Sequence, residues 1–128
     1  MEAKSGVDRL LELAYGNHPK SASLKPEGLK VLKTLRESGA QNMEQLMGVL
    51  GLDQNSAGGR KHFYLLMRPL RETGMIATRR AGGKAVYYLS YDGFSQFLKE
   101  IRKEAEYWLV PEESKGKIVE KSVGDRSI

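Results

Sequence analysis

The spacing of the apolar residues changes at Gly74. Before this glycine, large apolar residues recur every three or four positions, which is the period of an amphipathic helix. After it, the stretch MIATRRAGGKAVYYLS alternates around the pair Gly82-Gly83, a pattern typical of two short strands joined by a tight turn. The sequence therefore predicts an α+β chain that is mainly α with a small β-hairpin.

Two helices are expected in the first forty residues. The first covers residues 7–15, where apolar side chains recur at three and four, and residues 21–25 are predicted to be a linker. Pro26, a residue favoured at the first helical position, then begins the second helix, which Gly39 ends. Residues 1–25 are thus predicted to be an N-terminal helix and its linker.

Two further helices are expected before the hairpin. Asn42 is followed three residues later by a glutamine, which is the spacing of a capping box at the start of a third helix. Asn55 or Ser56 caps the fourth helix, predicted over residues 56–73. Pro69 lies within this helix, and because proline lacks an N–H group we expect a kink or a break just before it.

A last helix is predicted over residues 92–110, with Asp92 at its start and Pro111 at its end. Its apolar side chains recur at three and four. Residues 111–128 have balanced charge, few large apolar residues and no clear period, so they are predicted to be a disordered tail.

Composition excludes several classes of site. The chain has no cysteine, which rules out disulfides, thiolate zinc sites and cysteine nucleophiles. His18 and His62 have no third ligand at a suitable spacing, so we expect no metal and no cofactor. Nothing resembles a nucleophile with its base, and an enzyme is not expected. No apolar run approaches the roughly 18 to 20 residues of a membrane span, and the N-terminus fits no targeting peptide, so a cytoplasmic protein is expected.

The positive charge is concentrated in one part of the chain. Residues 56–91 hold seven cations and one anion, a net charge of +6. The other 92 residues hold 14 cations and 15 anions. The excess therefore lies on the fourth predicted helix and the hairpin, which indicates an acidic partner for that surface.

The stretches LRETGMI at 70–76 and TRRAGGKAVYYL at 78–89 resemble the end of the recognition helix and the wing of arsenic-repressor-like (ArsR-type) winged helix-turn-helix regulators, and more loosely those of the MarR type. The resemblance covers about residues 26–91. It implies a winged helix-turn-helix domain over 26–91 and a dimer that binds pseudo-palindromic duplex DNA. It further implies that the fourth helix enters the major groove, that the wing at 76–90 lies on the adjacent groove or backbone, and that terminal helices form the dimer contact. Metal sensing is not implied, because the cysteines that bind the metal are absent.

The candidate site residues follow from the helix and strand geometry. If Phe63, Met67 and Leu70 face inward, the outer face of the fourth helix carries the base-reading candidates, which are Arg60, Lys61, Tyr64 and Arg68. The wing candidates flank a turn small enough to enter the minor groove, and they are Arg79, Arg80 and Lys84. The dimer contact that the resemblance implies lies on the terminal helices, and its apolar candidates are Leu10, Phe97, Ile101 and Trp108.

Three functions are compatible with this pattern. The first is a sequence-specific double-stranded DNA-binding protein, most simply a homodimeric transcriptional regulator of the cytoplasm that is associated with the nucleoid. The second keeps the fold and changes the task to plasmid partition, replication or nucleoid organisation by cooperative coating of DNA. The third is a winged-helix module that binds another protein. On the blander interpretation, the cations merely keep a helix face and a sheet edge soluble.

Overall fold

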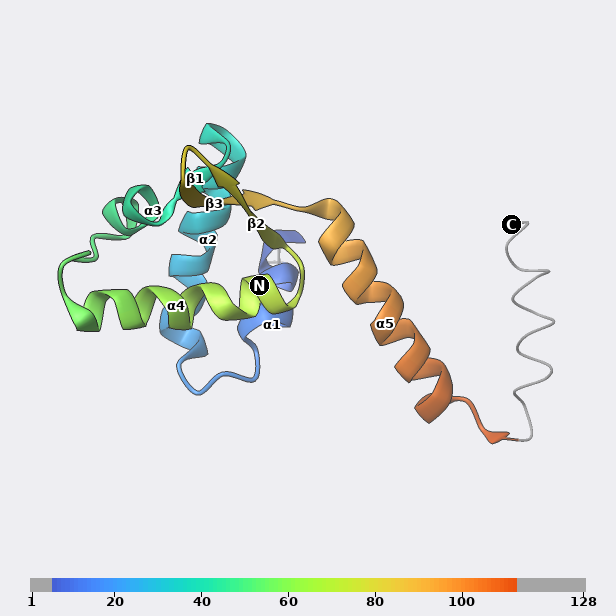
Figure 1. The fold of residues 1–128 in the computed structure, drawn as a ribbon. Helices are drawn as coiled ribbons and strands as arrows, with labels where there is room; N and C mark the ends of the chain where they lie inside the picture. Colours follow the sequence, from blue (N-terminus) through green and yellow to red (C-terminus); the bar gives the residue numbers. More distant parts are fainter. Residues whose placement is uncertain (1–5, 113–128) are drawn as a thin grey trace. The chain divides into compact units, whose positions relative to one another are not determined.

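The computed structural model describes residues 6–112, which contain five helices and one three-stranded antiparallel sheet (Figure 1). This confirms the predicted fold class, which is α+β with mostly helical residues. In chain order the elements are α1 (Gly6–Tyr15), α2 (Ser21–Ser38), β1 (Gln41–Asn42), α3 (Met43–Leu50), α4 (Ala57–Glu72), β2 (Ile76–Ala81), β3 (Lys84–Leu89) and α5 (Tyr91–Leu109). The described residues divide into two compact units, one ending at Ser95 and one beginning at Gln96.

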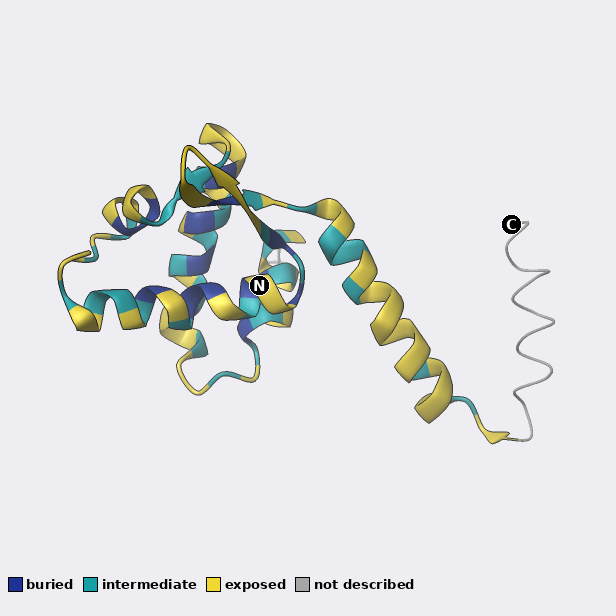
Figure 2. Ribbon diagram, viewed as in Figure 1, coloured by how far each residue is buried: buried dark blue, intermediate teal, exposed yellow. Residues whose placement is uncertain are grey.

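The core of the first unit is built around α2, which contacts α1, α3, α4 and β3. Each of these elements turns its apolar face inward, and the buried residues lie on the sides that face one another (Figure 2). The largest fully buried side chains are Tyr15, Leu24, Val31, Leu46, Met47, Phe63, Leu66, Met67, Leu70 and Ile76.

The helix α2 begins earlier than predicted. The proposed linker at 21–25 forms its first turns, and Pro26 lies inside the helix. No side chain caps this start, which is why the sequence gives no signal for it; instead the amides of Ser23 and Leu24 donate to the carbonyl of Lys20. Leu24 is fully buried, and its burial offsets the one helical hydrogen bond that proline cannot donate. The predicted domain boundary after residue 25 therefore falls within a helix.

The start of α4 agrees with the predicted cap, and the helix is not broken at Pro69. Ser56, one of the two predicted caps, accepts a 3.2 Å hydrogen bond from the amide of Gly59. The alternative of a break at Pro69 is wrong, because α4 continues through this residue to its end. Met67 before the proline and Leu70 after it are both buried, so packing holds the two sides in one helix despite the cost of a proline, about 3 kcal/mol in a helix interior.

The hairpin forms as predicted and gains a third strand. Gly82 and Gly83 join β2 to β3 with φ of 58° and 79°, as the type I′ turn requires. The sequence analysis missed β1, a two-residue strand that pairs with β3, so that the sheet order is β1-β3-β2. Asn42 pairs with Val86 in this sheet and also caps α3 through the predicted capping box, whose two hydrogen bonds with Gln45 measure 2.8 and 2.9 Å.

The helix predicted over 92–110 is present as α5, which begins one residue earlier and ends one residue earlier. Its residues are exposed or half-buried, and none is buried (Figure 2). All but the first two residues of the predicted disordered tail lie outside the described residues.

Candidate nucleic-acid interface

The outward face of α4 carries a row of cations and one tyrosine. Because Phe63 and Met67 are buried on one face of α4, the residues on the opposite face point to solvent. The row recurs at spacings of three and four and consists of Lys61, Tyr64, Arg68 and Arg71, all exposed. Arg71 was not among the predicted site residues, although its three-residue spacing from Arg68 would have placed it there.

Arg60 differs from the rest of the predicted α4 residues. Its guanidinium Nη1 donates a 2.7 Å hydrogen bond to the carbonyl of Gln54, in the loop that precedes α4. The side chain is half-buried in this position. Reading a base with Arg60 would therefore require that this hydrogen bond be broken, whereas the exposed cations of the row face no such cost.

The two arginines of the hairpin lie on opposite faces of the sheet. Arg80 pairs with Ala85, on the same face as Thr78 and Tyr87, because side chains alternate along a strand. Arg79 lies on the other face, where its guanidinium is 5.6 Å from the centre of the Tyr88 ring. Tyr87 lines the groove beside α4, so Arg80 shares that face with the row and Arg79 does not.

Lys84, the third predicted wing cation, already has a partner. Its Nζ lies 3.0 Å from Oε1 of Glu44, the second residue of α3. Both side chains are more than half exposed, so this ion pair contributes at most about 1 kcal/mol. It joins the tip of the hairpin to α3.

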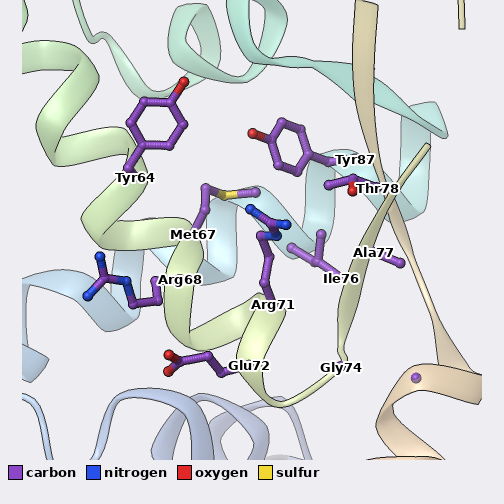
Figure 3. A pocket seen from close by; sticks show the side chains of 11 residues that line it. Tyr64, Met67, Arg68, Arg71, Glu72, Gly74, Ile76, Ala77, Thr78 and Tyr87 are labelled. Carbon is purple, nitrogen blue, oxygen red and sulfur yellow. The ribbon is translucent and has the colours of Figure 1, made fainter. Parts of the chain in front are cut away.

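A groove of about 650 Å³ runs between α4 and the sheet (Figure 3). The side chains on its α4 side include Tyr64, Arg68, Arg71 and Glu72, and those on its sheet side include Ile76, Thr78 and Tyr87. The buried ring of Phe63 makes edge-to-face contacts with Tyr64 and with Tyr87, at 5.7 Å between centroids in both cases. Burial raises the pKa of Tyr87, and the nearby positive charge of Arg71 opposes that rise.

The sequence matches no protein-family model and no curated protein.

The predicted dimer residues fall in both units. Leu10 is half-buried and packs against the core of the first unit, so only part of its side chain is left for a partner. In the second unit Phe97 is half-buried, whereas Ile101 is 49% and Trp108 is 72% exposed. The indole of Trp108 donates a 3.2 Å hydrogen bond to Glu104 on its own helix.

Other kinds of site find little support in the described part of the chain. His62 Nε2 lies 2.8 Å from a carboxylate oxygen of Glu27, so this histidine links α4 to α2. Within residues 6–112 no three histidine or carboxylate side chains converge as metal ligands would. None of the helices described is both long enough and apolar enough to cross a bilayer. What the arrangement offers is a set of exposed hydrogen-bond donors on one side of the first unit.

Proposed function

We propose that this protein is a winged helix-turn-helix protein that binds double-stranded DNA in a sequence-specific manner and acts as a dimeric transcriptional regulator. The observation that carries the proposal is the row on α4, which lies beside Arg80 on the facing side of the hairpin. In this proposal α3 and α4 are the two helices of the helix-turn-helix, and the β2–β3 hairpin is the wing.

The chemistry of the row suits a duplex. An α-helix fits the major groove, where arginine and lysine side chains bind the O6 and N7 atoms of guanine. Lys61 and Arg68 are exposed and make no ion pair within the described residues, so they are the leading candidates for reading bases. Arg80 on the wing reaches the neighbouring backbone or minor groove.

The second unit supports a dimer. Its apolar residues recur at spacings of three, four and three, at Leu98, Ile101, Ala105 and Trp108. This spacing is the a/d pattern of a coiled coil. The first half of this segment has an excess of cations, namely Lys99, Arg102 and Lys103, and the second half carries the anions Glu104 and Glu106. Antiparallel pairing of two copies places each half opposite the other, so opposite charges meet across the apolar seam.

The experiment that tests the function is selection from a random duplex library at near-physiological salt, with the mass of the protein in solution measured alongside. We expect a palindrome with half-sites about 10 base pairs apart, the spacing for two symmetric helices in successive major grooves. Retention of DNA without an enriched motif would point to coating or partition through phosphate contacts. Failure to bind any duplex at low salt would reject DNA binding and favour a protein-interaction module.

A further inference from the structure

We propose that the groove between α4 and the hairpin binds one backbone phosphate of the duplex, held by Arg71, Tyr64 and Tyr87. This inference rests on the proposed function and adds a specific phosphate site to it. None of the predicted wing residues takes part, and only Tyr64 belongs to the predicted recognition face. The three residues come from two elements, α4 and β3, so an occupant would contact helix and hairpin at once.

The rings of Tyr64 and Tyr87 both pack against Phe63. Phe63 is fully buried and contacts both rings edge to face, so it anchors two of the rings that line the groove to the core. Tyr87 is only 6% exposed, yet its ring reaches back toward α4 and directs its hydroxyl into the groove (Figure 3). That hydroxyl makes no hydrogen bond within the described residues and is not sealed from solvent. It is therefore a donor available to a ligand.

Arg71 supplies the charge. Its side chain extends from α4 toward the strands in Figure 3, whereas Arg68 and the carboxylate Glu72 point away from them. Arg71 forms no ion pair within the described part of the chain. Its positive charge opposes the rise that burial gives to the pKa of the Tyr87 phenol, so the two groups lie close enough to interact. A tyrosine phenol is protonated at neutral pH, and burial raises the pKa of Tyr87 further, so its hydroxyl keeps its donor.

A guanidinium and two phenol groups are the kinds of donor that phosphate oxygens accept. Arginine donates two parallel hydrogen bonds to phosphate oxygens, and neutral hydroxyl donors can satisfy those that remain. The backbone of a duplex is the source we infer. Arg68 and Arg71 of the α4 row line the groove, and Arg80 lines a neighbouring hollow that shares Tyr64 and Tyr87 with it, so the surfaces proposed to lie on DNA adjoin the site. A free phosphate ion has the same chemistry and is separated from DNA in the test below.

The test measures affinity for one random-sequence duplex as a function of salt concentration, since a phosphate contact does not depend on sequence. Arg71→Ala should weaken binding about tenfold and lower the slope of log K against log salt by about 1. Tyr87→Phe, which keeps the ring on Phe63, should weaken binding by about tenfold with the slope unchanged, because no charge is lost. The matched controls are Arg36→Ala on α2 and Tyr88→Phe on the opposite face of β3, and neither should change the affinity.

The double variant Arg71→Ala/Tyr87→Phe decides whether both residues hold the same group. If both residues donate to one phosphate, the affinity of the double variant should fall by well under the roughly hundredfold that two independent contacts would give. Additive losses, or a slope unaltered by Arg71→Ala while wild type binds duplex, would overturn the site and leave the proposed function standing. Absence of duplex binding by wild type would instead reject the proposed function, and this inference with it. Circular dichroism of each variant checks its fold.

A final arm identifies the source of the phosphate. Wild-type affinity is compared in chloride and in inorganic phosphate at equal ionic strength, and the two values should agree. A loss in phosphate buffer that Arg71→Ala abolishes would make the free ion the occupant and overturn the assignment to the DNA backbone.

Discussion

The hydroxyl of Tyr15 donates a 2.7 Å hydrogen bond to the main-chain carbonyl of Leu66, so the last residue of α1 is joined to the middle of α4. Tyr15 is fully buried, and its ring lies so close to Gly28 that a Cβ there would come within 2.6 Å of it. The N-terminal helix is thus part of the scaffold that positions α4.

Tyr15→Phe should lower the free energy of unfolding by about 0.5 to 1.5 kcal/mol, because it removes the buried hydrogen bond to the carbonyl of Leu66. Urea denaturation followed by circular dichroism measures this change. Tyr91→Phe, at an exposed position, is the matched control and should change stability little. Equal values for the two variants would show that the buried hydrogen bond adds nothing.

Alkaline pH should destabilise the protein through the same residue. Burial, with the Glu27 carboxylate adding to its effect, raises the pKa of Tyr15 far above its ordinary value. Below the unfolded pKa of about 10 the phenol is neutral in both states, and the full stability is present. Above it only the unfolded chain releases the proton, so stability falls by about 1.4 kcal/mol per pH unit for this group as pH rises toward the folded pKa.

Unfolding free energies measured from about pH 8 to about pH 11 test this slope. Tyr15→Phe should reduce it, and Tyr91→Phe should leave it unchanged. A slope that is the same in wild type and Tyr15→Phe would contradict the assignment to Tyr15.

The adjacent glycines at the start of α4 should respond in opposite directions to alanine. A Cβ on Gly59 would come within 2.3 Å of the Asp53 carbonyl oxygen, whereas one on Gly58 meets Ser56 Oγ at an ordinary 3.5 Å. Gly58→Ala should therefore stabilise the protein by about 0.5 to 1 kcal/mol through helix propensity. Gly59→Ala should destabilise it by about 1 to 3 kcal/mol, because backbone has to move. Thermal melts of Gly58→Ala and Gly59→Ala measure the two changes in stability. If both variants were stabilised or both destabilised, the close approach of Gly59 to the Asp53 carbonyl would be refuted.

The hairpin arginines should contribute unequally to DNA binding. Arg80 shares its face with Tyr87 beside α4, whereas Arg79 lies on the other side against Tyr88. Arg80→Ala should weaken duplex binding by about 1 kcal/mol or more and flatten its salt dependence, while Arg79→Ala should have a smaller effect. Binding isotherms at several salt concentrations compare the two. A larger loss for Arg79→Ala would place the duplex on the other face of the hairpin.

Ile101→Asp should dissociate the proposed dimer, because it puts a charge at the centre of the apolar seam of the second unit. Gln96→Asp introduces the same side chain outside that seam and should leave the dimer intact. Sedimentation or light scattering gives the mass of each. Dimers in both cases would move the interface away from Ile101.

The sequence predicted correctly those features that depend only on residues close together in the chain. The capping box at Asn42 and the tight turn at Gly82-Gly83 are short-range patterns, and both are present. The early start of α2 and the unbroken course of α4 through Pro69 depend on burial of Leu24 and Leu70 against distant parts of the chain, which the local sequence does not reveal.

The candidate site also has a part that local sequence predicted and a part that depends on tertiary structure. Periodicity placed Lys61, Tyr64 and Arg68 on one exposed face, and they are there. Treating the hairpin cations as one group ignored the strand register, which separates Arg79 from Arg80. The hydrogen bond of Arg60 to a loop carbonyl and the position of Arg71 beside Tyr87 are tertiary facts that no spacing rule contains.

The double role of Asn42 has a mechanical consequence. This residue ends β1 and caps α3, whose first residue is Met43, so no spacer separates sheet from helix. Bending at this junction would disturb both the pairing of Asn42 with Val86 and the capping hydrogen bonds with Gln45. When a load is applied to the hairpin, α3 has to rotate with it, and an insertion at this junction would uncouple the two.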